Sequence, residues 1–455
     1  MKIKHGILAV IVILFSALNM QSQTVMKLSL KEAQDYALKN NAQIKNAKLD
    51  IVLAKKKVWE TTAIGLPHAT GTANYSNILE VPEMNFGGYI DWQSIDATMP
   101  LTSDMVMDNY VEGEPIQLGT KENVTFDFNV SQLVFSGEYI VGLQASKIYK
   151  KLSEQNLQKT EADIKELIIN TYYLVLIAEK SKEILESTLT NTEKIAYEIK
   201  EMLNVGFVED TDFDQIELTL SNIKNSLSSL ERQVGLTYKL LKMQLGLETE
   251  IDIELTDNLD DILSNISYEQ LLNEQFFVEN NIDYKLITTQ ENLSNLSLKR
   301  EKSTFLPSVA AFYNHEEQMN KPEFNFSPPD IFGLNIEVPL LSSGMKLSKV
   351  SQAKIELEKV RNTKWQVEQN LILGVEQAKS DLKTNYEEYL NLKQNLELAK
   401  KIYEKTLTKY QEGISTSFDL TQVHNQYLTA QSNYFNKMID LLKANSGLNK
   451  LLYKN

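Results

Sequence analysis

Cysteine is absent from this sequence of 455 residues, and histidine is scarce. There are four histidines, and no two of them lie close together in the sequence. The absence of cysteine excludes a disulfide framework, a thiolate metal site, a cysteine nucleophile and a lipidated cysteine anchor. Four scattered histidines do not suit a histidine metal centre. We therefore predict no bound metal and no cofactor, and no group of residues in the sequence indicates a catalytic site.

Long hydrophobic runs are missing beyond the N-terminus. Met1–Gln23 has lysines near its start and an apolar core, Ile7–Leu18, and this pattern predicts a secretory signal peptide. The alternative is a membrane anchor, but a spanning helix needs about 20 apolar residues, and this core is shorter. No later stretch reaches roughly 18 apolar residues. The sequence therefore predicts an exported chain without a helical membrane span.

Glycine, proline and positive charge are also in short supply. The chain has 17 Gly and 9 Pro, and its formal net charge is −15. This acidic balance argues against nucleic acid as a partner, because the phosphate backbone attracts basic surfaces. The length exceeds what one compact core usually holds, so we expect two domains or an elongated molecule.

Two landmarks each occur twice, separated by the same distance. Asn40-Asn41 reappears as Asn280-Asn281, and Leu66-Pro67 reappears as Leu306-Pro307, each 240 positions later. Two independent landmarks with one spacing indicate an internal duplication. We divide the chain into a signal peptide at 1–23, a first structural repeat at 24–257 and a second at 258–455.

Both halves contain segments in which apolar and polar residues alternate. Alternation with a period of two predicts strands with one apolar and one polar face. It places one strand pair at about 67–135 and another at about 307–341. Within the first pair, Asn77–Glu122 is rich in Pro, Gly, Met and acidic residues, so we expect a surface loop there. The clearest apolar positions are Val124, Phe126, Phe128 and Val130 in the first half, and Phe332, Leu334, Ile336 and Val338 in the second.

The sequence after each strand pair predicts a long helix, a sharp turn and a returning helix. Gly137–Asn204 and Gly344–Gln411 contain no proline, and at 1.5 Å per residue each helix would be roughly 100 Å long. Gly206 and Gly413 interrupt the apolar pattern, which then resumes with coiled-coil spacing. We therefore predict a helical hairpin in each half, with turns near 206 and 413.

Four strands from one chain cannot close into a barrel, and their open edges would favour aggregation. Three chains would supply twelve strands, an even number that suits a transmembrane β-barrel. We therefore predict an α+β membrane protein in which a trimeric 12-stranded β-barrel, with four strands per chain, continues into a long α-helical coiled-coil barrel. In this fold Phe126, Phe128, Leu334 and Ile336 face the outer-membrane lipid.

With these features the chain resembles the TolC outer-membrane efflux family over nearly all of its mature length. The resemblance rests on the repeated Asn-Asn and Leu-Pro landmarks, on the strand-to-helix joints VSQLVFSGEYIVGLQASK and VPLLSSGMKLSKVSQAK, and on the turns NVGFVEDTDFDQ and YQEGISTSFDLTQ. It implies a homotrimeric exit duct in the bacterial outer membrane, with its helical barrel in the periplasm. It further implies two partners, a periplasmic adaptor (membrane fusion protein) and an inner-membrane pump of the RND or ABC type, and it implies no enzymatic activity.

The resemblance also implies roles for residues at the two turns. Asp419, six positions after Gly413, matches a position that forms a carboxylate ring in the narrow pore. Asp212, six positions after Gly206, matches a bracing position whose partner corresponds to Tyr410. The alternative is that both aspartates only cap the helices that begin there. The residues expected to contact the adaptor at the tip are Val205, Gly206, Phe207, Gly413 and Ile414.

The sequence departs from the family pattern at two positions near the second turn. Ser415 stands where some members have a basic bracing residue, and Gln422 stands where a second acidic residue occurs. We therefore expect the closing contacts to be weaker or differently arranged.

A second class of function is also compatible with the heptads and the signal peptide. A coiled-coil structural or adhesin-like surface protein without a pore would have both features. Such a stalk needs neither strand pairs nor a duplication, so the duct is the favoured interpretation.

Overall fold

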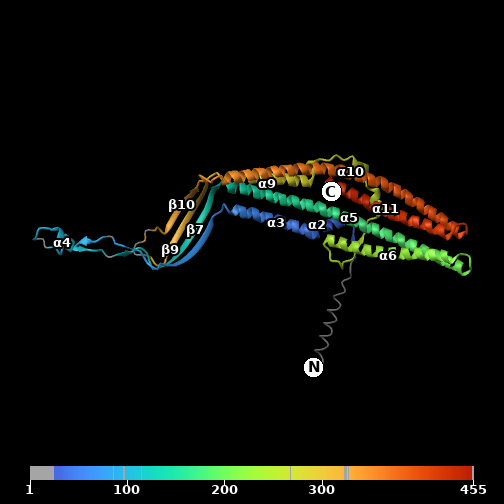
Figure 1. Ribbon diagram of the computed structural model, residues 1–455, viewed down its shortest axis with the longest axis horizontal. Helices are drawn as coiled ribbons and strands as arrows, with labels where there is room; N and C mark the ends of the chain where they lie inside the picture. The colour runs from blue at the N-terminus through green and yellow to red at the C-terminus, as the bar shows by residue number, and fades with distance from the viewer. Residues whose placement is uncertain are drawn as a thin grey trace, which may run out of the picture. The chain divides into compact units, whose positions relative to one another are not determined.

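The computed structural model describes residues 25–85, 87–95, 98–113, 115–266, 268–321, 325 and 327–452 (Figure 1). The predicted signal peptide at 1–23 lies outside the described residues. Contacts divide the chain into two units, and each unit combines segments from both halves of the sequence. The helical unit is Met1–Ala54, Tyr149–Asn292 and Glu358–Asn455, and the sheet unit is Lys55–Ile148 and Leu293–Leu357.

The sheet unit contains one four-stranded antiparallel sheet in the order β10-β9-β7-β2. Its strands are β2 (His68–Asn77), β7 (Glu122–Ser136), β9 (Ser308–Gln318) and β10 (Asp330–Glu337), and Figure 1 shows β7, β9 and β10 side by side. The alternation in the sequence thus predicted all four strands correctly. Strands β7 and β9 join the two halves of the chain, which leaves β2 and β10 as the two edges of the sheet.

The register gives the sheet one polar face and one face that is apolar except near the loop end, where His315, Glu317 and Asp330 lie on it. Residues directly opposite one another on neighbouring strands share a face. Phe128 lies opposite His315, and Asp127, on the other face, lies opposite Thr72 and Glu316. On the polar face the Asp127 carboxylate accepts hydrogen bonds from the side chains of Thr72 (3.4 Å) and Asn74 (3.2 Å). The predicted lipid-facing residues Phe126, Phe128, Leu334 and Ile336 all lie on the apolar face and are 47–61% exposed in the single chain.

The segment between β2 and β7 is more ordered than its composition predicts. Its first and last parts run antiparallel and form two short pairings, β3 with β6 and β4 with β5. Strands of two residues are too short to show an alternating pattern in the sequence. They form because the chain segments that continue from β2 and β7 run side by side. The elements are β3 (Glu83–Met84), β4 (Tyr89–Ile90), α4 (Ser103–Asp108), β5 (Tyr110–Val111) and β6 (Ile116–Gln117).

The helical unit contains two long hairpins, α5 with α6 and α10 with α11, and both turns lie at the same end of the unit (Figure 1). Helices α3, α5, α9 and α10 have residues in both units. In the described part of the chain, no helix has the length and apolarity needed to cross a membrane. The main helices are α2 (Leu30–Asn40), α3 (Ala42–Ala63), α5 (Gly137–Asn204), α6 (Asp210–Leu245), α9 (Ile282–Ser303), α10 (Met345–Gln411) and α11 (Ser417–Leu451).

Short elements surround the ends of the hairpins that lie away from the turns. A parallel pair of strands, β1 (Met26–Leu28) and β8 (Ile253–Leu255), brings the start of the described chain beside the segment after α6. The remaining elements are α7 (Leu259–Ser264), α8 (Tyr268–Leu272) and the 3₁₀ helix η1 (Val278–Asn280).

The repeated Asn-Asn landmark has a structural role that the sequence did not reveal. The buried side chain of Asn41 donates to the Gln244 carbonyl in the last turn of α6 (2.7 Å) and accepts the Gln43 backbone N–H (2.8 Å). Asn281 makes the same two bonds in the second half, to the Leu451 carbonyl at the end of α11 (3.1 Å) and from the backbone of Asp283 (2.9 Å). Each asparagine therefore caps one helix and holds the end of the returning helix of its own half.

Two separate cores hold the helical unit together. The larger one surrounds Tyr172, Leu241 and Leu382, away from the turns. The smaller one, which we call the tip cluster, lies near the turns and contains residues of all four hairpin helices. Its buried members are Ile195, Ala196, Ile199, Ile216, Tyr403, Tyr410 and Leu420. All of them except Ile195 are seam positions of the predicted coiled coils, so the heptad pattern identified most of this packed face.

Candidate functional site

The two turns have the same backbone geometry. In the first, Gly206 has a φ of +78°, and the backbone N–H groups of Gly206 and Phe207 bond to the carbonyls of Leu203 (3.0 Å) and Met202 (2.9 Å). Gly413 has a φ of +75° and makes the equivalent pair of bonds with its successor. This Schellman motif places the glycine in the left-handed region, where other residues are strained. The predicted turns near 206 and 413 are therefore built on glycines that the backbone conformation requires.

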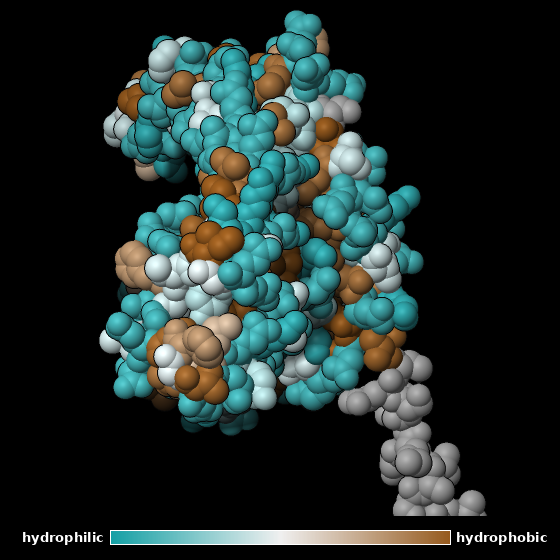
Figure 2. All heavy atoms as spheres, turned by 90° about the vertical axis from the view of Figure 1, so that its right-hand side faces the viewer, coloured by the Kyte–Doolittle hydropathy of each residue, from teal (hydrophilic) through white to brown (hydrophobic). Residues whose placement is uncertain are grey.

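Both turns expose large apolar side chains. Val205, Phe207 and Ile414 are 67–82% exposed, and Phe418 beside the second turn is also exposed. Figure 2 views the molecule from the end that carries the turns and shows separate apolar groups within a largely hydrophilic surface. Water-exposed phenylalanine and isoleucine at a turn are not explained by packing within the chain. A role of these residues in contacting an adaptor stays a prediction.

Asp212 connects the two hairpins. Its carboxylate accepts the backbone N–H of Glu209 (3.2 Å), which begins the capping box of α6. The same carboxylate accepts a hydrogen bond from the hydroxyl of Ser417, the first residue of α11, whose side chain is nearly buried. Asp212 therefore caps its own helix and also holds the start of the helix in the other hairpin.

Tyr410, the implied partner of Asp212, lies near it without a hydrogen bond. The Tyr410 hydroxyl is buried, and it has no hydrogen-bond partner among the described residues. Burial raises the pKa of Tyr410 to about 12, and the charge of Asp212 adds to this effect. The two groups are therefore near one another, but Ser417 occupies the bonding position. Nothing in the sequence marks Ser417 for this role, because it depends on how the two turns meet.

Asp419 bonds only within its own turn. Its carboxylate accepts the Thr416 hydroxyl (2.7 Å), the Thr416 backbone N–H (3.2 Å) and, at 3.4 Å, the Ser415 hydroxyl. These bonds, with the Thr416 hydroxyl first, lower the pKa of the Asp419 carboxyl below its ordinary value. Both aspartates thus cap the helices that begin at their turns, and Asp212 has the additional bond to Ser417. Capping leaves Asp419 ionised and exposed, which is compatible with a ring of charges.

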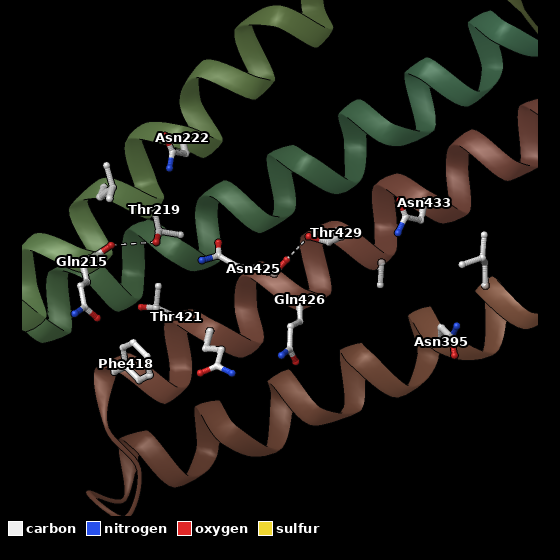
Figure 3. Close-up of a pocket in the computed structure, with 14 residues that line it drawn as sticks. Gln215, Thr219, Asn222, Asn395, Phe418, Thr421, Asn425, Gln426, Thr429 and Asn433 are labelled. Carbon is white, nitrogen blue, oxygen red and sulfur yellow. Dashed lines mark hydrogen bonds between the residues drawn. The ribbon is translucent and has the colours of Figure 1, made fainter.

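An uncharged groove of about 750 Å³ runs beside the turns between α6, α10 and α11. Figure 3 shows Asn and Gln side chains from α6 and α11 lying along it, with Asn395 on α10. No lining residue is charged, although charged residues make up 24% of the chain. The signal for this groove in the sequence is that Leu420–Asn436 contains no Asp, Glu, Lys or Arg. Side chains of this kind can donate and accept hydrogen bonds with a bound molecule without favouring either sign of charge.

Comparison with known proteins gives a family for part of the chain and a fold for nearly all of it. Residues 289–452 match the model of the family "Outer membrane efflux protein". No curated protein matches the chain.

Solved structures match over more than nine-tenths of the chain. They include the Campylobacter jejuni CmeC outer membrane channel, at 19% identity and TM-score 0.69, covering 93% of this chain and 85% of that one. The open state of the Neisseria gonorrhoeae MtrE outer membrane channel has 14% identity and TM-score 0.71, with 93% and 88% covered. The Vibrio cholerae outer membrane protein VceC has 14% identity and TM-score 0.69, with 93% and 95% covered. At these identities the similarity establishes the fold, which is that of outer-membrane channels with long helices.

Proposed function

We propose, since the chain belongs to the TolC-like family of outer membrane efflux proteins, that it is the passive exit duct of a tripartite efflux or type I secretion machine. The family is one of bacterial outer-membrane efflux channels and not of enzymes. The alternative of a coiled-coil stalk or adhesin without a pore is therefore set aside. What remains to be proposed is the assembly, the aperture and the partners.

The observation that carries the proposal is the open sheet with one apolar face. Among the described residues, β2 and β10 pair on one side only, and the apolar face is exposed in the single chain. Unpaired strand edges are not stable in hydrocarbon, because an N–H or C=O group without a hydrogen bond costs about several kcal/mol there. Three copies would pair every edge and form a twelve-stranded barrel, with lipid outside and the polar face around an aqueous lumen.

We assign the aperture to the turn end of the hairpins. Three copies of Asp419 around the axis would place exposed carboxylates in the narrowest part of the duct. Rings of carboxylates favour cations in a pore. Asp212 and Tyr410 belong to the same aperture by our proposal. Ser417 and Asp212 would keep the two hairpins together there, so that separation of the turns would widen the passage.

The partners follow from the same end of the molecule. Val205, Phe207 and Ile414 would insert into the periplasmic adaptor, because exposed apolar side chains at a protruding turn are suited to burial in a second protein. The adaptor would connect the duct to an inner-membrane pump of the RND or ABC type. The uncharged groove beside the turns is compatible with this proposal, since it presents hydrogen-bonding groups without charge repulsion.

The test is the conductance of the purified protein in planar bilayers. Wild type should conduct as a trimer and be blocked from the turn side by hexaamminecobalt(III). Asp419→Asn keeps an acceptor for the Thr416 backbone N–H and removes the charge, so it should weaken the block by about tenfold, or roughly 1.4 kcal/mol for a lost charge contact. Glu412→Gln, at the exposed position before Gly413, is the matched control and should leave the block unchanged.

Two results would count against the proposal. If Asp419→Asn channels are blocked as strongly as wild type, Asp419 caps α11 but does not line the aperture. If wild-type trimers insert but do not conduct, the chain is not a duct.

A further inference from the structure

His424 is fully buried in α11, one turn after Leu420 of the tip cluster. Its exposed fraction is 0%, and neither ring nitrogen has a hydrogen-bond partner among the described residues. An imidazole has one donor and one acceptor, and leaving both unsatisfied in an apolar site costs free energy. The proposed duct makes no use of this histidine. A polar group kept unpartnered at this position therefore needs a separate explanation.

Aromatic side chains surround the imidazole. The Tyr403 ring on α10 lies 4.8 Å from it between centroids, and Tyr403 in turn stacks on Tyr427 at 5.6 Å. The Tyr427 hydroxyl accepts the side-chain N–H of Gln431 (2.9 Å) and does not bond the imidazole. The imidazole thus fills the space between α10 and α11 close to the point where these helices meet α5 and α6.

No charged group on the neighbouring helices is placed to stabilise a protonated imidazole. The titratable groups around the tip cluster include Tyr403, Tyr410 and Glu404 on α10, Glu198 and Lys200 on α5, Asp212 on α6 and Tyr427 on α11 itself. Burial raises the pKa values of these tyrosines, and the three carboxylates add to this effect. None of them acts on His424, whose pKa is lowered to about 4 by burial alone. A proton on this ring would therefore be a buried charge without a counter-charge.

We propose that His424 is an acid-sensitive release for the tip cluster: when neutral it packs α11 against α10, and when protonated it leaves its site and loosens the hairpins near the turns. The release itself depends only on the packing of the four helices. Its effect on conduction rests on the proposed function, because loosening the turns widens a passage only if the protein is a duct with its aperture at the turns.

The direction of the effect follows from linkage. An exposed imidazole binds a proton near pH 6.5, whereas the packed one does so only near pH 4. Above pH 6.5 both forms are neutral, and the packed form has its full stability. Between these two values only the loosened form takes up the proton, so each pH unit shifts the equilibrium about tenfold toward it. The packing is therefore lost as the pH falls.

The test compares hydrogen–deuterium exchange of the full-length trimer at pD 7.5 and 5.0. The ratio of wild-type to His424→Phe rates at the same pD removes the intrinsic pH dependence of exchange. In peptides that cover 403–427, this ratio should rise about thirtyfold from pD 7.5 to 5.0. Peptides that cover 438–448, in the larger core, should show no change in the ratio. His424→Gln, which also cannot bind a proton, replaces the Phe variant if the larger ring prevents assembly.

The outcomes separate this inference from the proposed duct. A ratio that stays constant between the two pD values overturns the release, whatever the conductance does. A rise in exchange together with an acid-induced rise in conductance, both absent in His424→Phe, supports both proposals. A rise in exchange without any change in conductance supports the release and counts against an aperture at the turns.

Discussion

The two turns show how one backbone motif can serve two different purposes. Both end a long helix with a left-handed glycine and begin the next helix with a capping box that contains an aspartate. Yet Asp212 also receives the hydroxyl of Ser417 from the other turn, whereas Asp419 bonds only to its own. The shift of 207 positions that relates the turns places Asp210 where the second turn has Ser417.

That difference explains why the contact runs in one direction. Ser417 can donate a hydrogen bond to a carboxylate, but an ionised aspartate in the equivalent place cannot. The two turns share the glycine and the backbone it permits, and the difference between Asp210 and Ser417 decides which turn donates to its neighbour. The asparagine anchors show the opposite behaviour, because Asn41 and Asn281 keep both the residue and its bonds.

The largest expected effect tests whether the two halves are equivalent in the sheet. Phe128→Arg in the first half and Leu334→Arg in the second should each destabilise the protein in lipid vesicles by about 2–4 kcal/mol if they lie near the bilayer centre. Asn129→Arg, the matched control on the polar face, should cost far less. Equal losses at Phe128 and Asn129, measured as unfolding free energies in urea, would show that the faces are wrongly assigned.

The next effect concerns the asparagine anchors. Asn41→Ala and Asn281→Ala should each cost about 1–3 kcal/mol, because each leaves a buried carbonyl and a backbone N–H without partners. The readout is heat dissociation of the trimer together with exchange protection in the last turn of α6 or α11. Asn40→Ala, at the neighbouring half-buried position, is the control. If only one of the two variants lost stability, the two asparagines would contribute unequally to stability despite their shared geometry.

A smaller effect on stability should distinguish glycines with a left-handed backbone conformation from a glycine inside a helix. Gly206→Ala and Gly413→Ala require an alanine at φ near +75°, which should cost about 1–2 kcal/mol. Gly235→Ala inside α6, where an added methyl group meets nothing within 4 Å, should be stabilising by roughly 0.5–1 kcal/mol. Thermal denaturation of the three variants checks this order, and similar losses at Gly206 and Gly235 would contradict it.

The smallest effect separates the observed partner of Asp212 from the expected one. Ser417→Ala removes the hydroxyl that bonds Asp212 and should favour separation of the hairpins by about 1 kcal/mol. Tyr410→Phe removes a hydroxyl that has no partner, so it should be neutral or slightly stabilising. Exchange rates of the peptides that carry the two turns provide the measurement. If Tyr410→Phe loosens the turns more than Ser417→Ala does, the bond to Ser417 is not the contact that holds them.

Local patterns in the sequence determined much of this protein. Alternation at Phe126 and Phe128, or at Leu334 and Ile336, identified the strands and their apolar face, because a strand's side chains alternate whatever it packs against. Gly206 and Gly413 identified the turns because a left-handed backbone conformation is a property of the residue itself. Heptad spacing then identified the packed faces of the hairpins, which include Tyr403 and Leu420.

Only the tertiary structure decided which distant groups meet. Ser417 and Asp212 are 205 positions apart, Asn41 and Gln244 are 203 apart, and no local pattern relates either pair. Tyr410 lies near Asp212 without bonding it for the same reason, since a shift of one helix against another by part of a turn changes which hydroxyl reaches a carboxylate. The isolation of His424 depends on the packing of α11 in the helical unit, where Tyr403 of α10 lies against the ring. A single helix would leave the imidazole in water, whereas the packed unit leaves both ring nitrogens without a partner among the described residues.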